Sequence, residues 1–351
     1  MPHPDPAGPG LLDGRGDDEG WSCAAALVAT AAGTDRAFAD HPGGGQGPGA
    51  TGPATRFDLA SVTKAFVAVT AATLVDDGLL DLDAPAREVL DVPATSTGAT
   101  ARHLLTHTAG LRPSSLAWRD TADPDAVLAD AVGPPVAPPG EAHAYSCLGF
   151  VTLGLLLEEL AGERLDRTVA RRVGAPLGAA GLRWSPVDVV DAADVAPTEP
   201  GTPTGRVHDE LAAALGRPVG NAGLFGTLDD VARLAALVAG RGAASGRQVV
   251  SEASWRALVE PDDVARRAGA AWGQALGLRR GDPGFMVSGD QVGHAGFTGT
   301  SFVVDLGTGA TAVLLTNRVH GGRAASVVAR RRRLAALCGP AGRQRPSSTG
   351  W

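Results

Sequence analysis

Residues 58–64 read Asp58-Leu-Ala-Ser-Val-Thr-Lys64, and this segment opens a stretch, 60–77, whose apolar residues recur at helical spacing before Gly78. Glycine is the residue type that most often follows a helix end, so we expect a helix here with Ser61 on its first turn. Side chains three residues apart share one helix face, which brings the Ser61 hydroxyl within reach of the Lys64 amine. A backbone N–H on the first turn is free to bind an oxyanion. The segment therefore predicts a serine nucleophile with a lysine base.

Lys64 is the only lysine among 31 basic residues, and Tyr145 is the only tyrosine. Arginine cannot release its proton in a protein, whereas a buried lysine can act as a base. Tyr145 lies where a proline-rich loop meets an apolar helical segment, 148–160, and a phenol beside a lysine can relay protons. The alternatives are that Ser61 only caps the helix, Lys64 is a surface charge and Tyr145 is a packing residue.

A third segment, 293–300, reads Gly-His-Ala-Gly-Phe-Thr-Gly-Thr and leads into a predicted strand. Its glycines allow a ligand to approach the backbone, and an edge strand can donate an N–H to an oxyanion or pair with an extended substrate. His294 is its candidate polar group, either as a site residue or as a structural histidine.

Composition excludes several function classes. The 351 residues carry a formal charge of −7, which argues against nucleic-acid binding, and the basic run 330–333 lacks interleaved aromatic residues, so we expect it on the solvated face of a last helix. Cys23, Cys147 and Cys338 are too widely spaced for a zinc site, and their odd number argues against a disulfide framework. His208, Asp209 and Glu210 are adjacent, which is poor spacing for metal ligands. We predict no metal and no cofactor.

The N-terminal residues show no secretory signal and no stretch is long and apolar enough to span a membrane, so we expect a cytoplasmic protein with no membrane partner. The predicted organisation is an α/β sheet domain interrupted by a mainly helical region, with disordered ends. Its boundaries are 1–20 (disordered), 21–78 and 228–338 (sheet domain), 79–227 (helical region) and 339–351 (disordered). We expect strands at 23–30, 273–278, 300–304 and 311–315, and helices at 148–160, 228–240, 251–259 and 322–337.

Three motifs in this order, Ser61-Val-Thr-Lys64, Tyr145-Ser-Cys147 and His294-Ala-Gly296, resemble the SxxK, YxN and KTG/HxG motifs of the serine β-lactamase and penicillin-binding-protein superfamily. The segment 104–111, Leu-Leu-Thr-His-Thr-Ala-Gly-Leu, is similar to one typical of its class C-related branch, which holds esterases, D-aminopeptidases, transacylases and cell-wall peptidases. Residues 207–212 and 220–226 resemble segments of a subgroup that includes muramyl-peptide amidases. The resemblance covers residues 20–338.

This resemblance implies an α/β (α+β) fold of the β-lactamase/transpeptidase type, an antiparallel sheet flanked by helices with a mainly helical insertion. Ser61 would be the acylated nucleophile, Lys64 its base and Tyr145 the proton relay. The backbone N–H groups of Ser61 and Phe297 would form the oxyanion hole. The substrate would contact His294, Gly296 and Cys147.

The chain departs from the family pattern at two of these positions. Cys147 stands where the family has an asparagine, and a thiol cannot replace an amide that donates and accepts strong hydrogen bonds, so we expect poor β-lactam hydrolysis. His294 replaces a lysine, which predicts weaker recognition of a substrate carboxylate. Leu211 and Asn221 differ from the muramyl-peptide amidase pattern.

The leading hypothesis is a serine hydrolase that forms an acyl-enzyme on Ser61 from a small-molecule ester, amide or peptide. One alternative is an acyltransferase of the same fold. The other is a non-catalytic binding protein that retains the fold, and the substrate and oligomeric state stay open.

Overall fold

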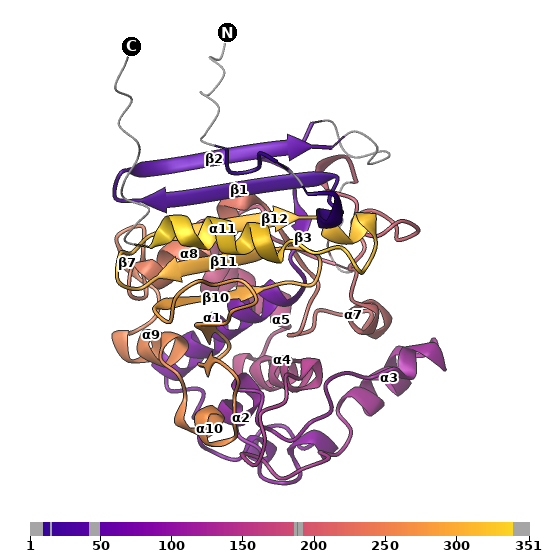
Figure 1. Ribbon diagram of the computed structural model, residues 1–351. Helices are drawn as coiled ribbons and strands as arrows, with labels where there is room; N and C mark the ends of the chain where they lie inside the picture. Colours follow the sequence, from indigo (N-terminus) through magenta and orange to yellow (C-terminus); the bar gives the residue numbers. More distant parts are fainter. Residues whose placement is uncertain (1–9, 15, 42–49, 186–187, 189–191, 340–351) are drawn as a thin grey trace, which may run out of the picture.

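The computed structural model describes residues 10–14, 16–41, 50–185, 188 and 192–339. Within them, the main layer is an antiparallel sheet of seven strands in the order β2-β1-β12-β11-β10-β9-β8 (Figure 1). The strands are β1 (Cys23–Thr30), β2 (Gly33–Asp40), β8 (Gly273–Gln274), β9 (Arg279–Arg280), β10 (Gln291–Ala295), β11 (Ser301–Asp305) and β12 (Thr311–Thr316). Because β1 pairs with β12, from Ala24 opposite Thr316 to Ala29 opposite Thr311, strands from the two ends of the chain form the centre of one sheet.

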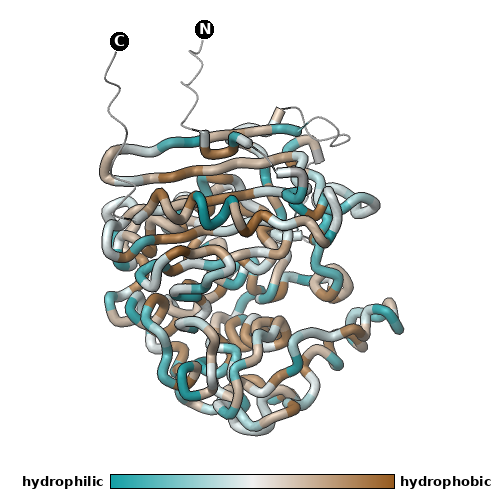
Figure 2. The backbone as a smooth tube through the Cα atoms, in the orientation of Figure 1, coloured by the Kyte–Doolittle hydropathy of each residue, from teal (hydrophilic) through white to brown (hydrophobic). Residues whose placement is uncertain are grey.

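Strand β1 shows why both faces of the sheet are covered. Successive side chains on a strand point to opposite faces, and here both sets are apolar. Ala24, Ala26 and Val28 belong to a core on one side, and Ala25 and Leu27 belong to the larger core on the other. Figure 2 shows the hydrophobic residues along these central strands. A strand with two apolar faces needs a layer on each side.

Helices supply both layers (Figure 1). Helix α11 (Val328–Cys338) covers one face, and α8 (Leu228–Ala239) packs on the other against β11 and β12. Helix α1 (Thr63–Asp76) follows the short 3-10 helix 60–62 and contacts α4, α5 and α9 (Glu252–Val259). Residues 63–74 of α1 are all buried, as expected for a helix that is apolar all round.

The helical region lies below the sheet in Figure 1. Its elements are α2 (Ala101–Leu105), α3 (Pro124–Ala131), α4 (Cys147–Ala161), α5 (Leu165–Val169), α6 (Ala175–Leu177) and α7 (Glu210–Leu215). A small sheet in the order β3 (Phe57–Asp58), β5 (Leu224–Gly226), β4 (Arg183–Trp184) joins this region to the start of α1. Helix α10 (Asp263–Arg267) and the hairpin β6 (Ala243–Ala244) and β7 (Arg247–Gln248) complete the described elements. In these residues no helix combines the length and apolarity that crossing a membrane requires.

The antiparallel sheet flanked by helices confirms the predicted fold class. Four local predictions are wrong. The strand expected at 273–278 is limited to Gly273–Gln274, and the last helix begins at Val328 instead of residue 322. The N-terminal segment was expected to be disordered, but Leu11 and Leu12 are buried in the core that Leu334 of α11 helps to form. Residues 1–9 and 15 of this segment, and residues 340–351 of the predicted disordered tail, lie outside the described residues. The basic run of α11 is solvated only in part: Arg333 is exposed, but Arg330 is 2% exposed and its Nε donates to Glu19.

Candidate active site

Ser61 lies on the 3-10 turn that leads into α1, at the junction of the sheet and the helical region. The preceding residue, Ala60, has a φ of +46°, a conformation that costs an L-residue about 1–2 kcal/mol. Two contacts hold it there: Ala60 N–H donates to Asp58 Oδ1 at 2.8 Å, and Thr300 Oγ1 donates to the carbonyl of Leu59 at 2.9 Å. The backbone that presents Ser61 is therefore fixed from the sheet side.

Lys64, one turn further along, is fully buried and its Nζ has three neighbours. It donates to Ser61 Oγ at 3.0 Å and to the backbone carbonyl of Asn221 at 2.8 Å, and it lies 3.6 Å from Cys147 Sγ. The structure thus brings together the serine and lysine that the sequence paired. The role of the Asn221 carbonyl was not predicted, although the segment that contains Asn221 was singled out by resemblance.

The pKa of Lys64 is raised, whereas a lysine that acts as a base is expected to have a lowered pKa. Burial alone would lower this pKa, but the negative charge that Cys147 and Tyr145 can carry raises it, and the net direction is upward. An ammonium at Lys64 is therefore favoured whenever one of these neighbours is ionised. The sequence could not show this, because Cys147 is 83 residues away.

Tyr145 is held in front of Lys64 by the loop that precedes α4. Lys64 Nζ lies 5.2 Å from the centroid of the Tyr145 ring, and the Arg279 guanidinium stacks on the same ring at 4.7 Å. The His107 ring contacts it with centroids 4.4 Å apart, and His107 Nδ1 accepts the N–H of Ser146 at 3.2 Å. His107 therefore positions the Tyr145 loop, and Arg279 is a cation of the site that the sequence did not reveal.

His294 belongs to this cluster as a neutral group. It is 1% exposed on β10, and burial, together with the charges of Arg279 and Lys64, holds its pKa well below the usual value. Its Nδ1 lies 3.1 Å from the carbonyl of Ala295. The imidazole cannot supply a positive charge near neutral pH, so Arg279 is the side chain on this wall that can.

Gly296 and Phe297 follow β10 and pack against the turn that carries Ser61. A methyl group on Gly296 would lie 2.6 Å from the carbonyl oxygen of Leu59 and would overlap Thr300 Oγ1, so no larger residue fits. The N–H of Phe297 has no hydrogen-bond partner among the described residues, and the N–H of Ser61 lies on a first turn, where helices leave such groups unpaired. These two N–H groups are thus the candidates for binding an oxyanion.

Asp58 is a buried carboxyl that shapes this turn. It accepts N–H groups from Ala60 and from His208, at 2.8 and 2.7 Å. Burial outweighs these hydrogen bonds and raises its pKa to about 6. Protonation of Asp58 just below neutral pH would therefore weaken the anchor of the nucleophile's turn.

A groove of about 480 Å³ lies beside Phe297 on the helical side. His208, which lines it, stacks on the Phe297 ring with centroids 5.8 Å apart. Its other walls include Trp118, Arg206, Glu210 and Arg323. No group of three or more His, Cys, Asp and Glu side chains in the described chain is arranged to hold a metal ion.

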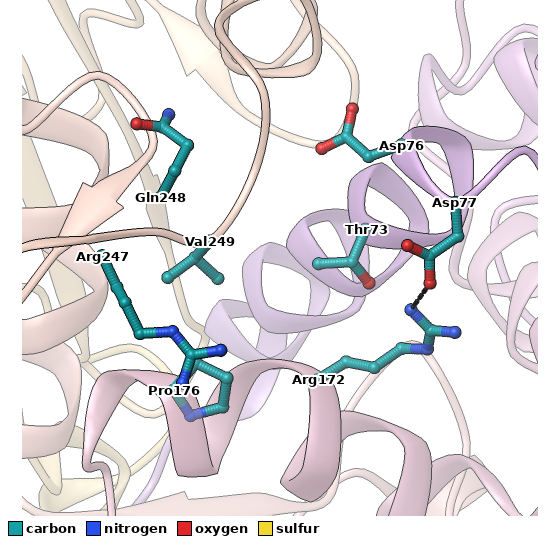
Figure 3. A pocket seen from close by; sticks show the side chains of 8 residues that line it. All are labelled: Thr73, Asp76, Asp77, Arg172, Pro176, Arg247, Gln248 and Val249. Atoms are coloured by element: carbon teal, nitrogen blue, oxygen red, sulfur yellow. Dashed lines mark hydrogen bonds and ion pairs between the residues drawn. The ribbon is translucent and has the colours of Figure 1, made fainter.

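A second pocket, of about 150 Å³, lies at the C-terminal end of α1 (Figure 3). Arg172 reaches across it to pair with Asp77, with Nη1 2.7 Å from Oδ2. None of the residues near Ser61 lines this pocket, so it is separate from the candidate active site.

Comparisons with known proteins identify the family of the chain. The family model described as Beta-lactamase matches residues 17–337. A protein of Escherichia coli (strain K12), provisionally named a D-alanyl-D-alanine carboxypeptidase, is 28% identical over 202 residues, which are 52% of this chain and 46% of that protein. The chain therefore spans about half the length of the curated relatives it matches.

Solved structures show the same fold. A crystal structure of SurE is similar with a TM-score of 0.70 at 25% identity, over 92% of this chain and 73% of that one. EstCE1, described as a hydrolase with promiscuous acyltransferase activity, has a TM-score of 0.68 at 22% identity, over 92% and 95%. With its fold and the matched family model, the chain belongs to the Beta-lactamase family of serine hydrolases and has the β-lactamase/transpeptidase-like fold.

Proposed function

We propose that this protein hydrolyses an ester or amide through an acyl-enzyme on Ser61. The observation that carries the proposal is the 3.0 Å hydrogen bond between Lys64 Nζ and Ser61 Oγ, made by a fully buried lysine. A surface lysine beside a capping serine would be exposed. A buried amine aimed at a hydroxyl is the arrangement by which an adjacent base activates a nucleophile.

The proton steps involve Lys64 together with its neighbours. Ser61 Oγ attacks the acyl carbon, and its proton passes to the group formed by Lys64, Tyr145 and Cys147. The N–H groups of Ser61 and Phe297 bind the negative oxygen that forms on the carbonyl. The leaving group receives the proton and departs, and a water then repeats the sequence on the ester and regenerates Ser61.

The pKa direction of Lys64 limits how the first proton is accepted. Since Cys147 and Tyr145 raise the pKa of Lys64 against the effect of burial, the ammonium form of Lys64 is favoured in the free site. Lys64 must therefore release its own proton before its amine can take that of Ser61. The neighbours of Lys64 thus set how readily it acts as the base.

The walls of the site support a small polar acyl donor. Arg279 provides a cation next to Tyr145. The Escherichia coli relative is provisionally named for a D-alanyl-D-alanine substrate, and a structure of SurE was solved with D-Leu. These points favour an ester or amide of a D-amino acid as the first substrate to examine.

Intact-mass measurement of labelling by an activated p-nitrophenyl ester or a fluorophosphonate tests the proposal. We expect one adduct on the wild-type chain and none on Ser61→Ala, with Ser114→Ala, an exposed serine, as the control that keeps the adduct. An adduct on Ser61→Ala would disprove the assignment. An unlabelled wild type would favour the non-catalytic binding protein, and an ester product formed from an added alcohol in place of free acid would favour the acyltransferase.

The three cysteines Cys23, Cys147 and Cys338 are free. Thiols persist in a reducing compartment, which supports the cytoplasmic location we propose. Fractionation of cells that express the chain would test it.

A further inference from the structure

The four arginines of the basic run on α11 do not share one task. Arg330 pairs with Glu19, Arg332 donates to the carbonyls of Pro283 and Met286, and Arg333 donates to carbonyls of residues 10–13. Arg331 instead reaches the turn after β10. The run therefore contains one member directed at the candidate active site.

Arg331 Nη2 donates to two carbonyl oxygens of that turn, Gly296 O at 2.7 Å and Thr300 O at 2.9 Å. Thr300 O also accepts the N–H of Gly296 at 2.7 Å. The guanidinium thus clamps both ends of the loop that carries Phe297. The N–H of Gly299 also donates to Gly296 O, at 3.2 Å, and together these hydrogen bonds fix the loop's conformation.

The charge of Arg331 has no counter-ion in the described residues. No carboxylate there lies within ion-pairing distance of it, and its Nε is buried without a hydrogen-bond partner. Burial, with repulsion from Arg318 and Arg279, lowers its pKa to about 9, so it stays a cation at neutral pH. Withdrawing a charge partly from water without a carboxylate partner is costly, which makes a purely structural reason for Arg331 weak.

The hydrogen bond from Arg331 to Gly296 O acts on the peptide group that also contains the N–H of Phe297. The carbonyl of Gly296 and the N–H of Phe297 are the two ends of one peptide unit. A cation that hydrogen-bonds to the carbonyl end polarises the unit, and hydrogen bonds linked in this way strengthen one another. The N–H end becomes a stronger donor.

We propose that Arg331 is a positioning residue that fixes and polarises the oxyanion hole through the Gly296–Phe297 peptide. This inference rests on the proposed function insofar as Phe297 N–H receives the oxyanion. It assigns one arginine of the basic run of α11 a part in the chemistry without contact between Arg331 and the substrate.

The test combines NMR with kinetics on the full chain. Protein labelled with ¹⁵N-phenylalanine gives eight backbone signals from its eight phenylalanines, and Phe297→Leu identifies that of Phe297. We expect the Phe297 N–H proton to move upfield in the order wild type, Arg331→Lys, Arg331→Gln, Arg331→Met, because Lys keeps the charge and Gln keeps only a neutral donor. Arg332→Met, which removes two carbonyl contacts elsewhere on α11, is the matched control and should leave this signal in place.

Kinetics with an activated ester should follow the same order. We expect kcat to fall about 10-fold in Arg331→Met, less than the ~100-fold that losing an oxyanion donor costs, with KM within twofold of the wild type. An unchanged Phe297 signal, an equal shift in Arg332→Met, or Gln restoring the signal as well as Lys would overturn the inference. If the wild type forms no acyl-enzyme while the Phe297 signal follows the charge, the proposed function fails and the polarisation by Arg331 stands.

Discussion

Replacing Gly296 by alanine should inactivate the enzyme while leaving it folded. The new methyl would lie 2.6 Å from the carbonyl oxygen of Leu59, whereas ordinary contacts begin at 3.4 Å, so Leu59 must move by about 0.8 Å. Leu59 lies two residues before Ser61, and its carbonyl is already held by Thr300. Misplacing a nucleophile by about 1 Å costs on the order of 100-fold in rate, so we expect kcat for a p-nitrophenyl ester to fall about 100-fold.

Gly289→Ala is the matched control, because a methyl there meets nothing within 4 Å and the residue lies just before β10. Overpacking at Gly296 should also lower the free energy of unfolding by about 1–3 kcal/mol, which urea denaturation would measure. A Gly296→Ala variant with wild-type kcat would refute the argument that the 296 loop and the Ser61 turn are locked together. A fall in rate of the same size in Gly289→Ala would refute it as well.

Two other substitutions test the electrostatics of the site. In Cys147→Asn, an amide oxygen replaces the weakly accepting thiol 3.6 Å from Lys64 Nζ. A stronger hydrogen bond worth about 1.4 kcal/mol would raise the rate of acylation by a chromogenic cephalosporin about tenfold. Equal acylation rates for Cys147→Asn and Cys147→Ala would contradict this prediction. For Asp58, the folded pKa of about 6 lies above the ordinary value of 3.8, so the folded state binds the proton more tightly and its stability falls as pH rises from about 4 through 6. The free energy of unfolding of the wild type relative to Asp58→Asn should therefore fall by about 3 kcal/mol across that range, at about 1.4 kcal/mol per pH unit, and a constant difference in urea denaturation at pH 4 to 7 would count against it.

The parts of the fold that could be predicted are those specified by local pattern. Helix α1 was expected from its apolar spacing and Gly78, which has a φ of +70°, and α8 and α9 were expected within one residue of their bounds. Strand β2 was missed because half of its residues are polar and it lies at the outer edge of the sheet. An edge strand with one solvated face has little apolar signal to detect.

The contacts of the candidate active site also differ in whether the local sequence could predict them. Ser61 and Lys64 are three residues apart, so helix geometry alone brings their side chains together. Arg331 and Gly296 are 35 residues apart, and Lys64 and Cys147 are 83 apart, so their contacts depend on how the layers pack. Composition shows that a basic run exists, but it does not show which backbone carbonyls the helix will meet. For that reason the sequence predicted a solvated run, whereas Arg330 is buried in the structure.

The upward pKa direction of Lys64 changes what a pH profile of this enzyme would report. If a neutral lysine were the base, the acid limb of kcat/KM would give the pKa of Lys64 alone. Because Cys147 and Tyr145 raise that pKa against the effect of burial, the position of the acid limb also depends on these two neighbours. Removing the Cys147 thiol, by Cys147→Ala, should therefore lower the pKa of Lys64 and move the acid limb to lower pH. An acid limb that stays in place would show that Cys147 does not contribute to the raised pKa of Lys64.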